Sequence, residues 1–258
     1  MKGSFAVLTS KSSAVQTALE TARKRHAIFQ GNHKSRFGQD FSGKILDFGC
    51  GAGGFVMAAT EAGLDAHGVE VDADRHKQFL YHARHAGFGQ TDRFTLYDGR
   101  LLPYASNSFD GCYSWFVFEH VTDPQVSLRE ITRVLKPGGT LSLFAEDTRN
   151  VWDGHAKRPW PSYLPREFAG AYLEGLGLSE RTDFIANFVV YISAPVICDI
   201  LTTLGMQIIY ANPRPARSPI REGLYVTSPD EARALGIKLR DMPTEGPHEN
   251  LTIFARKS

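Results

Sequence analysis

Residues 45–55, a glycine-rich stretch, constrain the fold of this chain more than any other segment. Ile45 and Leu46 are apolar enough for a buried strand, and residues 55–59 suit a helix that packs against it. The four glycines between them therefore form a turn from strand to helix. Glycine tolerates positive φ and lets a ligand lie against bare backbone. The stretch thus predicts a cofactor that crosses the tip of a sheet.

An acidic residue just before the glycines indicates which cofactor this is. Gly49, Gly51 and Gly54 have the spacing of a dinucleotide fingerprint, which is weak evidence when it stands alone. A dinucleotide would place its pyrophosphate at this turn, where Asp47 would repel it. A cationic amine would be attracted instead, and S-adenosylmethionine carries one. Asp47 therefore favours S-adenosylmethionine over NAD or FAD; the alternative is a solvated aspartate beside glycines that only pack.

Length and charge exclude some classes of function. A chain of 258 residues is long enough for one large α/β domain with insertions. Lys and Arg number 29 and Asp and Glu 28, so the formal net charge is +1 and gives no overall attraction for nucleic acid or an anionic membrane. The candidate basic patch is small and consists of Arg214, Arg217 and Arg221 with Tyr225.

The expected location follows from the cysteines and from the apolar runs. Cys50, Cys112 and Cys198 lie far apart without a CxxC pair, which indicates neither a disulfide framework nor a zinc site. Residues 1–13 lack the apolar core of a signal peptide, and no apolar run is long enough to span a bilayer. We therefore expect a soluble, cytoplasmic protein.

The regions on either side of the glycine turn read as helices and strands. Apolar residues at helical spacing predict a helix over residues 12–30, which would pack on the domain or cover a substrate opening, and residues 31–43 read as a loop. A strand over residues 66–71 contains Glu70, placed where a carboxylate can accept hydrogen bonds from ribose hydroxyls. A short strand ends at Asp98, which would face the same crevice and accept from an adenine amino group.

The same alternation continues to residue 145. The nearly continuous apolar run 112–118 predicts a central strand buried on both faces, with Glu119 and His120 at its mouth. Residues 123–139 suit a helix and its end, and residues 140–145 suit the next strand. Strands that alternate with helices through short connections are typical of a parallel sheet covered on both sides.

Six segments that occur in this order carry a resemblance to a known family. They are residues 46–53, Glu70 in Gly68-Val69-Glu70, Asp98 before Leu102-Pro103, Ser108-Phe109-Asp110, Glu119-His120-Val121 and Leu135-Lys136-Pro137-Gly138-Gly139. Each is common singly, but together they resemble the class I S-adenosylmethionine-dependent methyltransferases. The resemblance covers residues 44–145, a little under half of the chain.

The resemblance implies a fold for the remaining chain as well. This fold is a doubly wound, Rossmann-like α/β fold with a seven-stranded sheet, an antiparallel last strand and helices on both faces. Residues 205–210 and 251–255 suit the last two strands, and residues 193–205 suit the helix before them.

The same resemblance divides the chain into regions. We expect a single methyltransferase domain over residues 1–258, with a helical extension at residues 1–43. Insertions at residues 146–192 and 212–250 would cover the acceptor site. A helix is predicted at residues 165–174 in the first insertion, and a short helix would start at Ser228-Pro229 in the second.

The resemblance also implies which residues hold S-adenosylmethionine and its product S-adenosylhomocysteine. Asp47 and the glycine turn would hold the methionine part, Glu70 the ribose, and Asp98 with the Gly99 backbone the adenine. Residues 114–120 would border the sulfonium and the methyl acceptor. The predicted cofactor contacts are Asp47, Gly49, Cys50, Gly51, Gly53, Glu70, Val71, Asp98, Gly99, Arg100 and Trp115.

A metal ion is not part of the prediction. The ubiquinone-pathway O-methyltransferases of this superfamily have a pair like Glu119-His120, preceded three residues earlier by another glutamate, and these acids hold a divalent metal. This chain has Phe116 at that position. His82 and His85 share a helix face, but no carboxylate or cysteine completes a site there at an obvious spacing.

Three residues are candidates for catalysis. The methyl group of a sulfonium is already electrophilic, so the protein must mainly hold the acceptor in line and exclude water. A hydroxyl acceptor gains from a base, and His120 at the strand mouth has a suitable ordinary pKa, although it could instead pack or cap the following turn. Asp153 and His155, in a segment rich in Trp and Pro, could orient the acceptor or act as an alternative base.

The sequence thus predicts methyl transfer from S-adenosylmethionine to a small-molecule acceptor, with a hydroxyl oxygen as the preferred target. An RNA or protein methyltransferase and a non-catalytic S-adenosylmethionine-binding protein are the alternatives. A nucleic-acid partner is not expected, and a membrane span is not expected either. The acceptor and the oligomeric state do not follow from the sequence.

Overall fold

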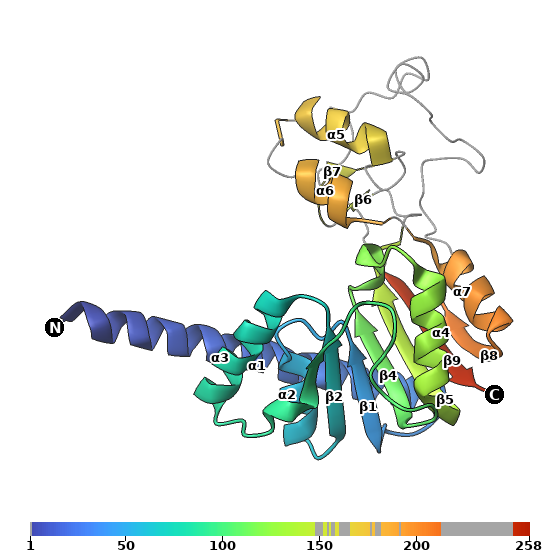
Figure 1. Ribbon diagram of the computed structural model, residues 1–258, viewed down its shortest axis with the longest axis horizontal. Coiled ribbons are helices and arrows are strands. Elements are labelled where there is room, and N and C mark those ends of the chain that lie inside the picture. Colours follow the sequence, from blue (N-terminus) through green and yellow to red (C-terminus); the bar gives the residue numbers. More distant parts are fainter. Residues whose placement is uncertain are drawn as a thin grey trace.

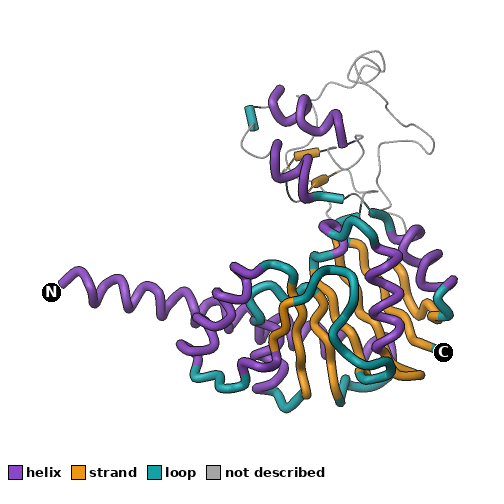
Figure 2. The backbone as a smooth tube through the Cα atoms, in the orientation of Figure 1, coloured by secondary structure: helices purple, strands orange, loops and turns teal. Residues whose placement is uncertain are grey.

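A seven-stranded sheet forms the centre of the molecule (Figures 1 and 2). The structure is a computed structural model that describes residues 2–147, 152–153, 155, 158–159, 166–175, 177–178, 182–190, 192–212 and 250–258. In spatial order the strands are β3 (Phe94–Leu96), β2 (Asp65–Glu70), β1 (Lys44–Phe48), β4 (Phe109–Trp115), β5 (Leu135–Ala145), β9 (Leu251–Lys257) and β8 (Met206–Ala211). Strands β3 to β5 are parallel, and β9 is antiparallel to both of its neighbours. The predicted fold class is therefore confirmed.

Helices cover both faces of this sheet. Those flanking it are α1 (Lys2–Phe37), α2 (Gly54–Glu61), α3 (Ala73–Ala86), α4 (Pro124–Val134) and α7 (Ala194–Thr203), with short 3₁₀ helices η1 (Thr91–Arg93) and η2 (Phe118–His120) in the connections. Buried residues of α1, α2 and α3 form one core cluster, and those of α4 and α7 form the other. The sheet thus separates two apolar layers, as the doubly wound pattern requires.

Strand β1 shows how the sequence period assigns side chains to these layers. Successive residues of a strand point to opposite faces. Leu46 and Phe48 accordingly belong to the cluster with α4 and α7, and Ile45 belongs to the cluster with α1 and α2. Asp47 has the same parity as Ile45, so its carboxylate lies on the side of α1 and α2. This places an acid under the N-terminal helix.

Several boundaries differ from those that the sequence predicts, and α1 begins at Lys2 rather than at residue 12. Helix α1 continues through residues 31–37, which the sequence pattern assigns to a loop, because Phe37 packs against Phe254 of the core cluster. Strand β4 ends at Trp115 rather than at residue 118, because Phe116 has a φ of 55°, in the left-handed region that interrupts an extended strand. Strand β5 begins at Leu135 rather than at residue 140.

The first insertion folds into small elements above the carboxyl ends of the parallel strands (Figure 1). They are β6 (Trp152–Asp153), β7 (Arg158–Pro159), α5 (Arg166–Gly175) and α6 (Thr182–Phe188), and α5 corresponds to the helix predicted at residues 165–174. Leu173, Ile185 and Val189 form a small apolar cluster of their own. The second insertion, with Arg214, Arg217, Arg221, Tyr225 and the helix at Ser228, lies outside the described residues, as does Trp160.

Among the described residues, the helices are either too short or too polar to cross a bilayer. This includes α1, which is 36 residues long and whose arm before Val15 extends away from the sheet (Figure 1).

Candidate active site

One large cavity lies at the carboxyl ends of the central strands. Its volume is about 1470 Å³, and it extends from the rim of β3, past the glycine turn, to the segment after β4. Its walls come from α1, the β1–α2 turn, the ends of β2 and β3, helix α3, and residues 115–127. Ligands of doubly wound sheets bind in this position, where neighbouring connections diverge to opposite faces.

The glycine turn forms the floor of the cavity and has room for a ligand. Gly51 has a φ of 56°, and a Cβ atom built there would meet nothing within 4 Å. Its N–H donates to Oε2 of Glu70 at 2.9 Å, and Oε1 of Glu70 accepts from the N–H of Val71 at 2.8 Å. Glu70 therefore lines the cavity as predicted, and it also holds the turn in shape.

The other predicted turn residues divide between the cavity and the core. Gly49 and Cys50 line the cavity, and burial raises the pKa of the Cys50 thiol well above its ordinary value. Gly53 is not among the lining residues. A Cβ atom there would lie 2.4 Å from Cδ2 of Phe79, so this glycine allows α3 to pack against the turn. Only part of the glycine pattern thus faces a ligand.

Asp47 lies beneath the turn rather than in the cavity wall. It is 3% exposed, and burial raises its pKa to about 7; Arg25 acts in the opposite direction, and Glu70 adds to the rise. The carboxyl is therefore partly protonated at neutral pH. A ligand amine above the turn would favour the charged form, because an opposite charge stabilises a carboxylate.

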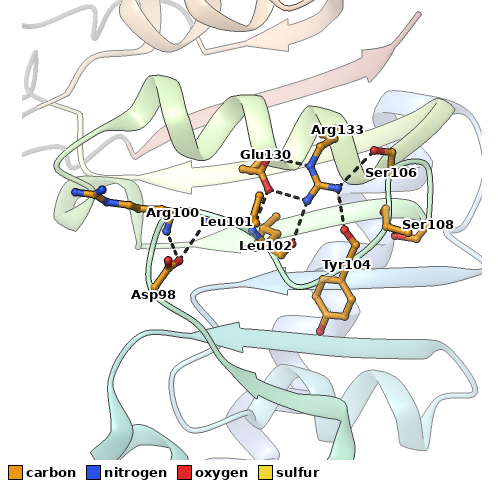
Figure 3. Close-up of polar contacts among 10 residues, drawn as sticks. Asp98, Arg100, Leu101, Leu102, Tyr104, Ser106, Ser108, Glu130 and Arg133 are labelled. Atoms are coloured by element: carbon orange, nitrogen blue, oxygen red, sulfur yellow. Dashed lines mark hydrogen bonds and ion pairs between the residues drawn. The ribbon is translucent and has the colours of Figure 1, made fainter.

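The adenine end of the predicted site lies at the rim beside β3. Val71, Asp98, Gly99 and Arg100 all line the cavity there. Asp98 is exposed, and its Oδ1 accepts from the N–H groups of Arg100 at 2.9 Å and Leu101 at 3.1 Å (Figure 3). These two hydrogen bonds lower the pKa of Asp98, so it is a carboxylate at neutral pH.

The loop after Asp98 is fastened to α4 by an ion pair. Nε and Nη2 of Arg133 donate to the two carboxylate oxygens of Glu130 at 2.8 and 2.7 Å. The same guanidinium donates to the carbonyls of Leu102 at 3.0 Å and Tyr104 at 2.8 Å, and Glu130 accepts from the N–H of Leu102 (Figure 3). Glu130 is buried, so this pair positions the rim of the cavity from below.

Helix α1 supplies cavity residues that are absent from the predicted cofactor contacts. Thr17, Ala18, Thr21 and Arg25 line the cavity, while the helix packs through Phe29 and its apolar neighbours. The helix therefore packs on the domain and also borders the cavity. On the face of α1 that lines the cavity, Arg25 is a charged residue in a row of small uncharged residues. The sequence indicates a role for Arg25 only once it is known which face of the helix lines the cavity.

Two aromatic residues line the cavity beside Arg25. Trp115, a predicted contact, lines the cavity next to Phe116, and their ring centroids are 5.3 Å apart. The guanidinium carbon of Arg25 lies 5.8 Å from the centroid of the Trp115 ring, within the range of a cation–π contact. Phe116 adopts its left-handed φ where the chain leaves β4, and residues held in such conformations cluster at functional sites.

His120 and His155, both predicted as catalytic, come together at the acceptor end. Their ring centroids are 5.2 Å apart, and Phe184 of α6 lies within 6 Å of both rings. Nδ1 of His120 lies 2.6 Å from the carbonyl oxygen of Phe188. A carbonyl only accepts, so Nδ1 carries the hydrogen and Nε2 has the free lone pair of the neutral ring. His120 also lines the cavity.

Glu119, next to His120, is a buried acid outside the three catalytic candidates of the sequence. It is 1% exposed, and burial raises its pKa to about 8. The backbone N–H groups of Glu119 and Glu146 lower the pKa, but their distances or angles do not meet the criteria for a hydrogen bond to the carboxylate. One ligand atom each from Glu119, His120 and His155 lie within 4.8 Å of one another. Asp153, the third catalytic candidate, belongs to β6, and its side chain lies outside what the structure describes.

The order of the strands and the glycine turn over the cavity define a Rossmann-like fold of the methyltransferase type. A Mesorhizobium loti S-adenosylmethionine-dependent methyltransferase has this fold, with a TM-score of 0.54 and 21% identity over 84% of this chain and 92% of that one. The [4+2]-cyclase SpnF shares it equally, with a TM-score of 0.54 and 20% identity over 89% and 80% of the two chains. These likenesses establish the fold.

Sequence comparisons show which class of domain the central part of the chain resembles. Residues 46–143 match the methyltransferase domain family. An uncharacterized methyltransferase of Mycobacterium tuberculosis is 38% identical over 110 residues, which are 43% of this chain and 40% of that protein. Residues 46–143 therefore match a methyltransferase domain of the class I S-adenosylmethionine-dependent type, and S-adenosylmethionine is the cofactor of that class. The match spans well under half of the relatives' length.

The residues present fit this cofactor. The open space at Gly51 is a cradle that any side chain would fill. Acids at Asp47 and Glu70 lie beside it, and Arg25 approaches from α1. A zwitterionic amino acid with an adjacent ribose therefore meets groups of suitable charge.

Proposed function

We propose that the protein transfers a methyl group from S-adenosylmethionine to a small-molecule acceptor, with a hydroxyl oxygen as the methylated atom. The observation that carries this proposal is that one cavity is lined by His120 and by the predicted cofactor residues other than Asp47 and Gly53. Its volume of about 1470 Å³ exceeds the roughly 300–1,000 Å³ of common single-ligand pockets. A donor and an acceptor can therefore occupy it together.

The cofactor end of the cavity would hold the donor through the backbone and buried charges. Gly49 and Gly51 would border the methionine part, Glu70 would accept from the ribose hydroxyls, and Asp98 with Gly99 would meet the adenine. Arg25 is placed to pair with a carboxylate, because its guanidinium faces the same cavity. When bound, S-adenosylmethionine supplies an electrophilic methyl group on its sulfonium.

The acceptor end would orient a hydroxyl group and remove its proton. The hydrogen bond from Nδ1 of His120 to the Phe188 carbonyl fixes the ring and leaves Nε2 as the proton acceptor. Trp115 and Phe116 would exclude water from the acceptor side. The two insertions at residues 146–192 and 212–250 are proposed as its cover, within one methyltransferase domain.

Calorimetry with S-adenosylmethionine, S-adenosylhomocysteine and NAD tests the donor half of this proposal. We expect binding of the two sulfur cofactors and none of NAD. An acceptor screen with a labelled methyl donor then tests the other half, with hydroxylated small molecules compared against RNA and protein. Binding of NAD alone would overturn the assignment. Cofactor binding without label transfer to any acceptor would instead favour a non-catalytic binding protein.

A further inference from the structure

The group formed by Glu119, His120 and His155 joins two parts of the chain at the acceptor end. Glu119 and His120 belong to η2, directly after β4, whereas His155 belongs to the first insertion. The possible ligand atoms of the three residues lie within 4.8 Å of one another. Two ligands on opposite sides of an ion, each at about 2.1 Å, are about 4.2 Å apart. Small side-chain movements would therefore close the group around one ion.

Glu119 provides independent evidence that something binds here. It is 1% exposed, and neither carboxylate oxygen has a hydrogen-bond partner among the described residues. Burying an acid without a partner is unfavourable, and buried polar groups are usually satisfied by a protein group, water or an ion. The two histidines each offer a ligand atom within 4.8 Å of one from Glu119. A cation between the three residues would satisfy the acid.

His120 is oriented as metal-binding histidines are. A ligating imidazole usually donates its other ring N–H to a carbonyl or carboxylate, which fixes the tautomer and the direction of the ring. Nδ1 of His120 has this contact with the carbonyl oxygen of Phe188, at 2.6 Å. Nε2 is thereby left with a lone pair for an ion.

We propose that Glu119, His120 and His155 bind one divalent transition-metal ion. Two imidazoles with one carboxylate suit zinc and the neighbouring first-row metals, whereas magnesium and calcium prefer oxygen ligands. The sequence predicts no metal because the position three residues before Glu119 holds a phenylalanine. The third ligand instead comes from residue 155, which only the fold of the insertion brings near.

Such an ion would lie on the acceptor side of the cavity, since His120 is part of the cavity wall. Three protein ligands leave a coordination position for an acceptor oxygen. The site does not depend on the proposed methyl transfer, because metal binding is measured without cofactor or acceptor. With the ion bound, His120 is a ligand, and its role as a free base applies only to the metal-free protein.

Titration of the chelator-treated full-length protein with Co²⁺ tests the proposal, with visible absorption to report the ligands and calorimetry to report stoichiometry. We expect one equivalent to bind to the wild-type protein. In Glu119→Gln and His155→Ala the Kd should rise by at least about 100-fold. His85→Ala is the matched control, because its Nδ1 also contacts a backbone carbonyl, that of Tyr81, on the exposed face of α3. It should bind like wild type.

For each variant we would also measure circular dichroism, which reports whether it folds, and S-adenosylmethionine binding, which reports whether the donor site is intact. If Glu119→Gln does not fold, His155→Ala gives the answer alone, since residue 155 lies outside the sheet. A wild-type protein that binds no Co²⁺ overturns the proposal. Equal affinity in wild type, Glu119→Gln and His155→Ala also overturns it, because the ion would then bind elsewhere.

Discussion

The proposed cofactor half and the proposed acceptor half of the cavity are built in different ways. The floor under the cofactor comes from one continuous stretch, the β1–α2 turn, and its backbone shape is maintained by Glu70 at the end of the next strand. The acceptor end depends on side chains from η2, α6 and the first insertion. Binding of a common donor can thus be encoded locally, whereas acceptor choice depends on segments that meet only in the folded chain.

A buried acid in each half makes the contrast concrete. Asp47 and Glu119 have pKa values raised by burial, to about 7 and about 8. Asp47 has the opposing charge of Arg25 nearby, whereas no charged partner for Glu119 is present among the described residues. Among the described residues, the buried acid of the first half thus has a cationic side chain acting on it, whereas neither Lys nor Arg acts on the buried acid of the second half.

Replacement of His120 should break the acceptor half alone and have the largest effect. In His120→Ala, we expect turnover to fall by about 10²- to 10⁴-fold, the usual contribution of a positioned base, with S-adenosylmethionine affinity unchanged. Steady-state rates and calorimetry measure the two quantities, and His85→Ala is the control. Wild-type turnover in His120→Ala would refute a role in the reaction. Turnover of the wild-type protein after metal removal distinguishes a free base from a metal ligand at His120. Turnover that persists without metal indicates a free base, because a free base needs no metal.

Filling the cradle at Gly51 should break the cofactor half alone. Gly51→Val places a branched side chain into the open space above the turn, and we expect S-adenosylmethionine affinity to fall by at least about 100-fold. Gly87→Val is matched, because Gly87 has a φ of 70° and a Cβ atom built there would also meet nothing within 4 Å. Both variants should lose similar stability through strain. Equal affinity of the two would show that Gly51 does not face the cofactor.

Removing the ion pair under the rim tests how rigid the cofactor half is. Arg133→Met retains bulk but leaves Glu130 buried without its partner, and we expect the free energy of unfolding to fall by about 3 kcal/mol. Arg23→Met is the control, because Arg23 pairs with Glu61 in a similar two-point manner on the surface, and its loss should cost much less stability. Denaturant unfolding compares them. Equal losses would contradict the importance of burial.

The smallest expected effect concerns pH and Asp47. A cationic ligand favours the charged carboxylate, so binding is strongest above the free-protein pKa of about 7 and weakens as the pH falls through it. S-adenosylmethionine affinity should rise by roughly 10-fold between pH 6 and pH 8. Asp47→Asn should bind more weakly at pH 8 and lose this slope. If the affinity of Asp47→Asn still rises with pH, a group other than Asp47 is responsible for the pH dependence.

The parts of the molecule that could be predicted are those that depend on residues close together in the sequence. The turn at Gly51 and the acids Glu70 and Asp98 follow from strand period, glycine spacing and order along the chain. The family resemblance implies the two C-terminal strands, and the fold confirms them. The predicted end of β4 is wrong because the apolar run continues past Phe116, whose left-handed φ has no signal in composition. Period alone cannot report such a break.

The remaining part could not be predicted because it depends on contacts between distant segments. Arg25 and Trp115 are 90 positions apart in sequence, and they meet only because α1 packs on α2. His155 reaches Glu119 through the fold of an insertion that has no strong period. Local sequence patterns do not predict contacts between residues that are far apart in the sequence.

The position of α1 as a wall of the cavity has a consequence for how binding can be observed. Residues 14–25 border the ligand space, while the first turns of the same helix extend away from the sheet (Figure 1). Occupancy should therefore slow amide hydrogen exchange in residues 14–25 and leave residues 2–10 unchanged. Residues 14–25 would then report ligand binding, and residues 2–10 of the same helix would serve as the reference. Ligand binding could thus be followed without any label.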